Sequence, residues 1–113
     1  MARVLKRGDI VWATLDPVIG HKQAGMRSVL VISDEILNRH SGTVIAMAIT
    51  SREPRASFPL TYPLSKEIGR KLSWVKITQI RTLSTERLGK TIGHVSDSEM
   101  ETILEGLNEA LGN

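Results

Sequence analysis

The chain has 113 residues, which is enough for one domain and too few for two, so we expect residues 1–113 to fold as a single unit. Hydrophobic residues make up 41% of the sequence and charged residues 24%, as in ordinary globular proteins, and no apolar run approaches the roughly 20 residues of a membrane-spanning helix. The N-terminus lacks a signal-peptide pattern and the chain lacks cysteine, so we expect a cytoplasmic protein without disulfides.

The net charge of +3 hides an uneven distribution of charged residues. Five of the 12 acidic residues lie within residues 97–109, a segment without Lys or Arg, which leaves 7 acids against all 15 basic residues elsewhere, a net charge of +8. Such a cationic body favours a polyanionic partner through phosphate contacts and counterion release. A basic surface that only faces solvent is the alternative that charge alone leaves open.

Three β-strands are expected in the first half of the chain. Their residues are β-branched or apolar, and the first run alternates so that Ile10 and Trp12 share one face before Asp16-Pro17 ends it. The expected strands are residues 9–15, 28–33 and 43–50, with a loop over 18–26 and a turn over 34–42 between them.

The second half predicts further strands and one helix. A basic, proline-containing connection over residues 52–71 is unusually long for a loop that has neither function nor partial order. Strands are expected over 72–80 and 90–95, with one helical turn capped by Ser84 between them. Ser96 and Glu99 form a capping box, and the apolar residues that follow at helical spacing are Met100, Ile103, Leu104, Leu107 and Leu111. This mainly β pattern with a terminal amphipathic helix predicts a small, strongly bent antiparallel β-barrel.

Arg27 stands between the glycine-containing loop and the buried strand that follows it. A guanidinium on a strand stays charged, is held in position and forks onto two phosphate oxygens. An exposed basic residue at a strand end is the simpler interpretation of the same position. Composition and spacing alone do not decide between the two.

The order of the motifs carries a resemblance. RGDIVWATLDP, GHKQAGMR, VLVIS, AMAITS and TQIRTLSTERLG follow one another at spacings that resemble the MazF/PemK (also called Kid) family of bacterial toxin endoribonucleases, across essentially the whole chain. The resemblance implies an SH3-like barrel of the MazF/PemK/CcdB type, a homodimer, and sequence-specific cleavage of single-stranded RNA such as mRNA without a cofactor. It also implies neutralisation by a MazE-like antitoxin whose acidic, partly disordered tail covers the RNA groove.

Cleavage of RNA without a metal requires the neighbouring 2′-hydroxyl to attack its own phosphate, which leaves 2′,3′-cyclic phosphate and 5′-hydroxyl ends. The protein then takes one proton, gives one to the leaving oxygen and stabilises charge on the phosphoryl oxygens. The sequence contains no HExxH, no close His pair and no carboxylate cluster at metal-ligand spacing, so we expect side chains rather than a metal in these roles.

The resemblance makes Arg27 catalytic and gives Thr50 a hydrogen bond to the scissile phosphate, although a Thr at a strand end is also common for its β propensity alone. His21 lies in the glycine-containing loop, where a general base, a contact to an RNA base and a solvated loop histidine are the three interpretations left open. In one branch of the family an Arg and an Asp act as acid and base where this chain has Lys76 and Thr78. Only the Arg27 and Thr50 arrangement therefore transfers.

The predicted RNA-binding residues are polar or basic and lie next to these positions: Lys22, Gln23, Ser51, Arg52, Arg55, Lys76 and Gln79. We expect Trp12 and Trp74 to fill the core, because aromatic residues are only 4% of the chain, with Trp74, Phe58 or Tyr62 as the candidates for base stacking. The acidic terminal helix is expected away from the RNA.

Two functions from different classes compete. The first is a ribonuclease toxin that stops translation and growth. The second is a non-catalytic toxin on the same barrel that inhibits a protein such as DNA gyrase and needs no phosphate-holding arginine. Arg27 with Thr50 and the cationic body favour the ribonuclease. A family member that has lost activity and serves as a regulator is a third interpretation, which Thr78 supports.

Overall fold

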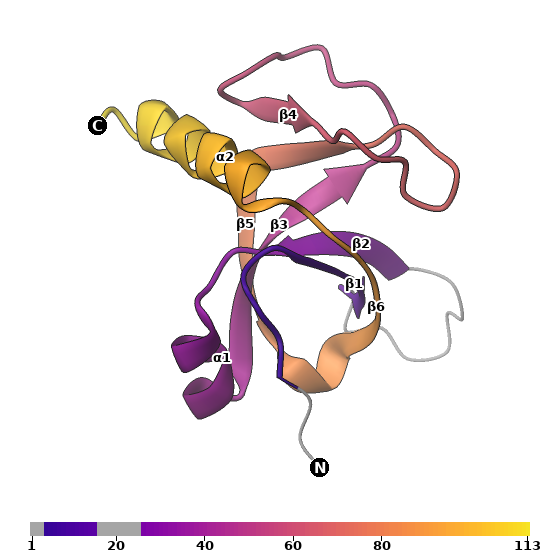
Figure 1. Cartoon of the computed structure of the whole chain (residues 1–113), viewed down its shortest axis with the longest axis vertical. Helices are drawn as coiled ribbons and strands as arrows, with labels where there is room; N and C mark the ends of the chain where they lie inside the picture. Colours follow the sequence, from indigo (N-terminus) through magenta and orange to yellow (C-terminus); the bar gives the residue numbers. More distant parts are fainter. Residues whose placement is uncertain (1–3, 16–25) are drawn as a thin grey trace.

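The computed structural model describes residues 4–15 and 26–113, and one antiparallel sheet organises them (Figure 1). Its six strands lie in the order β4-β5-β3-β2-β1-β6. The elements in chain order are β1 (Asp9–Thr14), β2 (Met26–Val31), α1 (Glu35–Ser41), β3 (Thr43–Thr50), β4 (Thr61–Pro63), β5 (Trp74–Ser84), the 3₁₀ turn η1 (Thr85–Arg87), β6 (Leu88–His94) and α2 (Asp97–Ala110).

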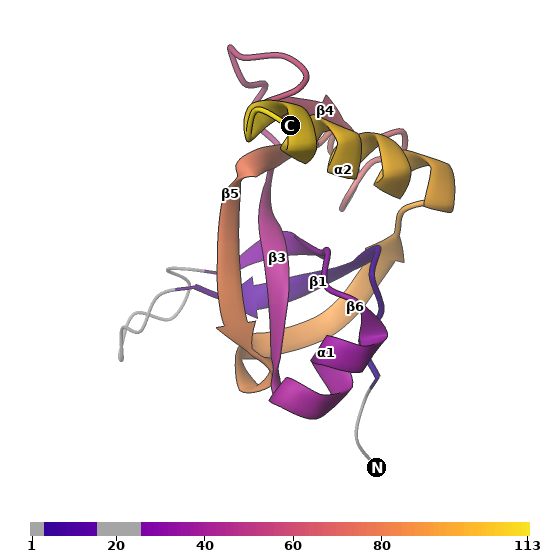
Figure 2. The ribbon, with the colours of Figure 1, turned by 90° about the vertical axis from the view of Figure 1, so that its left-hand side faces the viewer.

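The sheet is strongly bent, and the cause is an irregularity in β5, its longest strand. Met47 of β3 lies opposite Ile80, but the next residue, Ala48, lies opposite Lys76. Three residues of β5 therefore have no counterpart on β3, which forms a bulge and bends the strand. Figure 2 shows β3 and β5 running across the direction of β1 and β6. The sheet stays open between β4 and β6, yet this barrel-like, mainly β architecture with a terminal helix confirms the predicted fold class.

Each face of the sheet carries its own apolar core, because successive side chains on a strand point to opposite faces. The core under α2 consists of Ile10, Leu30, Ile32, Met47, Ile49, Leu64, Val75, Ile77, Val95, Met100 and Ile103. The core on the other face consists of Leu5, Val11, Ala13, Val29, Val31, Val44, Ala46 and Leu83. The register of the central strands is thus fixed from both sides.

Two elements differ from the sequence-based expectation. The expected turn over residues 34–42 contains α1, which Asp34 caps by accepting a hydrogen bond from the backbone N–H of Ile36 (3.0 Å) and which ends at Gly42 with a φ of 70°. This helix leaves Ile36 71% exposed, so it has no apolar stripe that the sequence could reveal. The expected connection over 52–71 contains β4, whose Thr61 lies opposite Lys76.

The terminal helix α2 begins as predicted, with the Ser96 hydroxyl accepting from the backbone N–H of Glu99 at 3.1 Å. In a capping box the Glu99 carboxylate would bond back to the backbone N–H of Ser96. Here it instead accepts hydrogen bonds from the Tyr62 hydroxyl (3.2 Å) and the Ser65 backbone N–H (3.1 Å). Glu99 therefore ties the start of α2 to β4 and to the connection that follows it. Within the described residues, no helix has the length and apolarity of a membrane span.

We predict that Glu99→Gln lowers the pKa of Tyr62. Burial raises the pKa of this hydroxyl, and the negative charge and hydrogen bond of Glu99 raise it further. The substitution removes the negative charge, so the pKa moves back toward the ordinary tyrosine value. Tyr62 is the only tyrosine in the chain, so ultraviolet titration of tyrosinate reports this group alone.

The same substitution has a signature in stability. A raised pKa in the folded state leaves the free energy of unfolding unaffected below the ordinary tyrosine pKa and lowers it as pH rises through the folded-state pKa. This alkaline loss should be smaller in Glu99→Gln than in the parent. Identical tyrosinate titrations in both proteins would contradict the proposed role of the Glu99 charge.

Candidate functional site

The register between β2 and β3 brings Arg27 and Thr50 together. Val29 opposite Ala48 is the outermost pair of this ladder, and Arg27 and Thr50 each lie two residues beyond it on their own strands. Alternation along a strand places both side chains on one face. On the other side of β3, Lys76 of β5 lies opposite Ala48, so it faces the same way. Residues 27, 50 and 76 thus meet at the end of three neighbouring strands.

Arg27 is exposed and only partly engaged. Its Nη1 donates to the backbone oxygen of Met26 at 2.8 Å, which holds the side chain along the strand end. Among the described residues, its remaining guanidinium N–H groups have no hydrogen-bond partner. A guanidinium fixed at one nitrogen and open at the others is suited to a bidentate contact with a phosphate.

Thr50 is half-buried, and its hydroxyl oxygen accepts the backbone N–H of Arg52 at 3.1 Å. This bond folds the chain back directly after β3 and fixes the hydroxyl. The oxygen already accepts one hydrogen bond, so the O–H group remains free to donate one. The described part of the chain offers it no acceptor. Thr50 can therefore donate to an anion beside Arg27.

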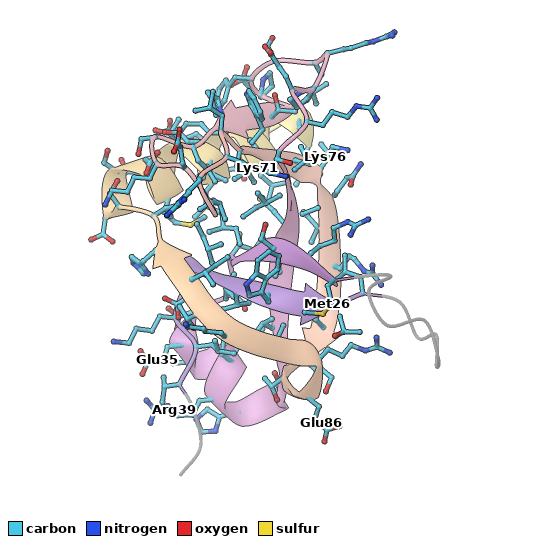
Figure 3. The ribbon with its side chains drawn as sticks, turned by 90° about the vertical axis from the view of Figure 1, so that its right-hand side faces the viewer. Met26, Glu35, Arg39, Lys71, Lys76 and Glu86 are labelled. Carbon is cyan, nitrogen blue, oxygen red and sulfur yellow. The ribbon has the colours of Figure 1, made fainter. Side chains whose placement is uncertain are left out.

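A hollow of about 630 Å³ opens in front of these residues. It lies between the ends of β1, β2 and β3 on one side and the connection between β4 and β5 on the other. The residues that line it include Trp12, Met26, Arg27, Ser28, Thr50, Ser51, Ile68, Gly69, Lys71, Ser73, Lys76 and Gln79. Lys71, Lys76 and Met26 are labelled in Figure 3.

A second hollow of about 340 Å³ continues from the first. The two share Thr50, Lys76 and Gln79, and the second adds Arg52 and Arg55 from the connection after β3. Together they form one groove, called here the cationic groove, with the shared residues at its centre. Glu53 is the one acidic residue among the described residues that line it.

The irregularity in β5 shapes the middle of the cationic groove. Residues 77–79 have no counterpart on β3, so this part of β5 moves out of the regular ladder. Gln79 is exposed as a result and reaches both hollows, while Ile77 remains fully buried in the core. A bulge that aims one side chain into a site while anchoring its neighbour is a recurrent feature of such positions.

The structure brings together every described residue that the sequence predicted as catalytic or RNA-binding, whereas the stacking candidates Phe58, Tyr62 and Trp74 line neither hollow. The seven are Arg27, Thr50, Ser51, Arg52, Arg55, Lys76 and Gln79, and all line the cationic groove. His21, Lys22 and Gln23 lie outside the described residues. No residue of the acidic helix α2 lines either of these two hollows, in agreement with the expected separation.

Trp12 is the main residue that the sequence analysis misplaced. It was expected in the core, but its side chain is 38% exposed and lines the first hollow. Its partner on β2 is Ser28, one position from Arg27 and beyond the apolar pairs of both cores. Alternation along β1 predicts that Trp12 is buried, because it shares a face with buried Ile10. Only the pairing of β1 with β2 shows that Trp12 lies beyond the buried part of that face. Trp74 is half-buried.

The geometry of the cationic groove fits a phosphodiester strand. It offers three permanent guanidinium cations, two lysines and the Thr50 hydroxyl on an open surface. Within residues 4–15 and 26–113, no three His, Asp or Glu side chains gather as metal ligands would. The chemistry that these groups support is binding and stabilising negative charge on phosphoryl oxygens.

Comparison with known proteins agrees with this chemistry. The model of the family described as "PemK-like, MazF-like toxin of type II toxin-antitoxin system" matches residues 6–111. The chain is 39% identical over 110 residues to endoribonuclease EndoA of Bacillus subtilis, covering 96% of this chain and 95% of that protein. It is 35% identical over 111 residues to endoribonuclease MazF of Staphylococcus saprophyticus, with 96% and 92% covered.

The fold has a counterpart among solved structures. A MazE-MazF crystal structure from Deinococcus radiodurans superposes with a TM-score of 0.81 at 26% identity, covering 98% of each chain.

We predict that Thr50→Val loosens the chain after β3. Valine keeps the shape and β propensity of threonine but leaves the Arg52 N–H without its acceptor, so the free energy of unfolding should fall by about 1 kcal/mol. The Arg52 amide should exchange its hydrogen several-fold faster than in the parent. Thr50→Ser, which keeps the hydroxyl, is the matched control and should restore protection of this amide. Equal exchange in Thr50→Val and the parent would show that the 3.1 Å bond does not order this segment.

Proposed function

Because the chain belongs to the family of PemK-like, MazF-like toxins of type II toxin–antitoxin systems, we propose that it is an endoribonuclease that cuts single-stranded RNA without a metal. The observation that carries the proposal is that Arg27 and Thr50, each two residues beyond the Val29–Ala48 pair on β2 and β3, line the same hollow of the cationic groove. The names of the two curated relatives support the same activity.

In this proposal the scissile phosphate lies at the centre of the groove. Arg27 binds two of its oxygens and stabilises the charge that grows there as the 2′-hydroxyl attacks. Thr50 donates a hydrogen bond from its hydroxyl to one of the same oxygens. The P–O5′ bond then breaks, and the products are a 2′,3′-cyclic phosphate and a 5′-hydroxyl. His21 is proposed to take the proton of the 2′-hydroxyl and to return a proton to the leaving 5′-oxygen.

The remaining residues position the RNA strand. Ser51, Arg52 and Arg55 follow β3 and contact backbone on one side of the scissile phosphate, while Lys76 and Gln79 hold the strand at the centre. Lys22 and Gln23 are proposed to contribute from the segment before β2. These contacts serve binding and register, and base preference follows from the shape of the surrounding segments.

The proposed biological setting is the bacterial cytoplasm, where the activity would stop translation and growth. The proposed partners are a second copy of the chain and a MazE-like antitoxin, the latter in line with the solved MazE-MazF assembly. An acidic antitoxin segment would compete with RNA for the cationic groove through the same charges.

A toxin that only binds a protein target such as DNA gyrase has no need of the Arg27 and Thr50 arrangement. A family member without activity has no need of it either. Both interpretations are excluded if the purified protein cuts RNA and if one substitution in the groove abolishes the cut while the fold survives.

We predict that Arg27→Ala lowers the rate of RNA cleavage in EDTA by about 100- to 1,000-fold, as expected when one charge-stabilising donor is lost. Arg27→Lys keeps the charge but loses the fork and should recover only part of the rate. The measurement is single-turnover cleavage of a mixed-sequence RNA, with mapping of the 5′ ends and circular dichroism to verify the fold.

A parent protein that leaves RNA intact in EDTA would refute the proposal and favour the protein-binding toxin. Cleavage by Arg27→Ala at the parental rate would refute the assigned role of Arg27. Growth arrest on expression, relieved by the same substitution, would argue against an inactive regulator.

A further inference from the structure

The connection between β4 and β5 ends in a tight turn with an unusual residue. Ile68 and Lys71 exchange two backbone hydrogen bonds, of 2.9 and 3.0 Å, across Gly69 and Arg70. Both central residues have positive φ, 58° at Gly69 and 69° at Arg70. Such turns favour Asn and Gly, and Arg70 is the one non-glycine residue with positive φ among the described residues.

The turn is held in place from its base. The backbone N–H of Leu64 donates to the oxygen of Ser73 (2.9 Å), and the Ser73 hydroxyl donates to the oxygen of Lys71 (3.1 Å). Glu99 of α2 accepts the N–H of Ser65. Residues 64–73, called here the hairpin arm, are therefore a positioned element, and the strained conformation of Arg70 is maintained by bonds on both sides of it.

The hairpin arm forms one wall of the cationic groove. Ile68, Gly69, Lys71 and Ser73 line the first hollow, the one that also contains Arg27 and Thr50. Arg70, at the tip between two of these lining residues, is exposed and lies outside the lining of both hollows. In the described part of the chain its guanidinium forms no hydrogen bond or ion pair. A cation is thus kept, without an internal partner, where a neutral Gly or Asn would fit the backbone better.

We propose that the tip of the hairpin arm is a phosphate-binding clamp, in which Arg70 grips an RNA phosphate next to the one that Arg27 holds. This inference rests on the proposed function and adds a second binding wall to it. RNA is taken as the ligand because the arm borders the hollow in which the proposed reaction on a phosphodiester takes place, and an acidic protein segment is the alternative that the test separates. In this proposal the turn keeps Arg70 at a strained positive φ because that backbone conformation directs its charge toward the RNA.

The test compares two variants that remove both the charge and the strain with one that keeps both. Arg70→Gly and Arg70→Asn suit the positive φ, while Arg70→Lys preserves the cation. Arg39→Gln is the matched control, because Arg39 is an exposed cation of α1 that pairs with Glu35 and does not line the groove. Affinity for a mixed-sequence 2′-O-methyl RNA, which cannot be cut, is measured by fluorescence anisotropy over a range of salt.

We expect Arg70→Gly and Arg70→Asn to weaken RNA binding roughly 3- to 10-fold at low salt and to reduce the slope of log K against log salt by about 0.7, the loss of one phosphate contact. Their melting temperatures should equal or exceed that of the parent, so that weaker binding is not a result of unfolding. Arg70→Lys and Arg39→Gln should bind almost as the parent does.

Unchanged RNA affinity in Arg70→Gly and Arg70→Asn would overturn the inference. If those variants instead lost affinity only for poly-glutamate, the arm would be a protein-binding element and the RNA clamp would be wrong. A parent that neither binds nor cuts RNA would refute the proposed function, whereas a parent that cuts RNA alongside variants that bind it equally well would refute the clamp alone.

Discussion

The pairing of β2 with β3 in one register is the constraint on which the site depends. Val29 and Val31 enter one core, and Leu30 enters the other, so a slip of one residue would move apolar side chains to the wrong face on both sides of the sheet. Arg27 and Thr50 lie on the same two strands just beyond these buried pairs. Burial of their neighbours therefore fixes where both residues lie, and the arrangement proposed as catalytic requires no bond between the two side chains.

The cationic groove is assembled from segments that are distant in sequence. Arg27 comes from β2, Lys76 from β5, Arg52 and Arg55 from the connection after β3, and Lys71 from the hairpin arm between β4 and β5. The acidic residues of α2 lie outside the two hollows. Because these acidic residues lie apart from the basic ones, the cationic groove is strongly positive although the net charge of the chain is only +3. The bulge in β5 adds Gln79 to that surface at no cost to the core, since Ile77 stays buried.

Much of this could be predicted from the sequence, because local signals carried it. Alternation and β-branched residues indicated the main strands, and Ser84 and Ser96 are N-caps in the structure, as predicted. Contacts between residues that are far apart in the sequence could not be predicted. The side of the barrel on which Trp12 becomes exposed depends on strand pairing, and α1 depends on Asn38, a buried residue whose side chain donates to the distant Leu5 backbone at 2.7 Å. The adjacency of Arg27 and Thr50 was an expectation from family resemblance, and only the β2–β3 register gives its physical reason.

The central claim is that Arg27 and Thr50 act on one phosphate, and a double-substitution cycle tests it most directly. Cleavage of one RNA oligonucleotide is measured as kcat/KM for the parent, Arg27→Ala, Thr50→Val and the double variant. If both groups hold the same phosphate, the double variant should lose far less than the product of the two single losses, with a coupling of at least about 1 kcal/mol. Losses that multiply independently would contradict a shared phosphate and with it this account of the site.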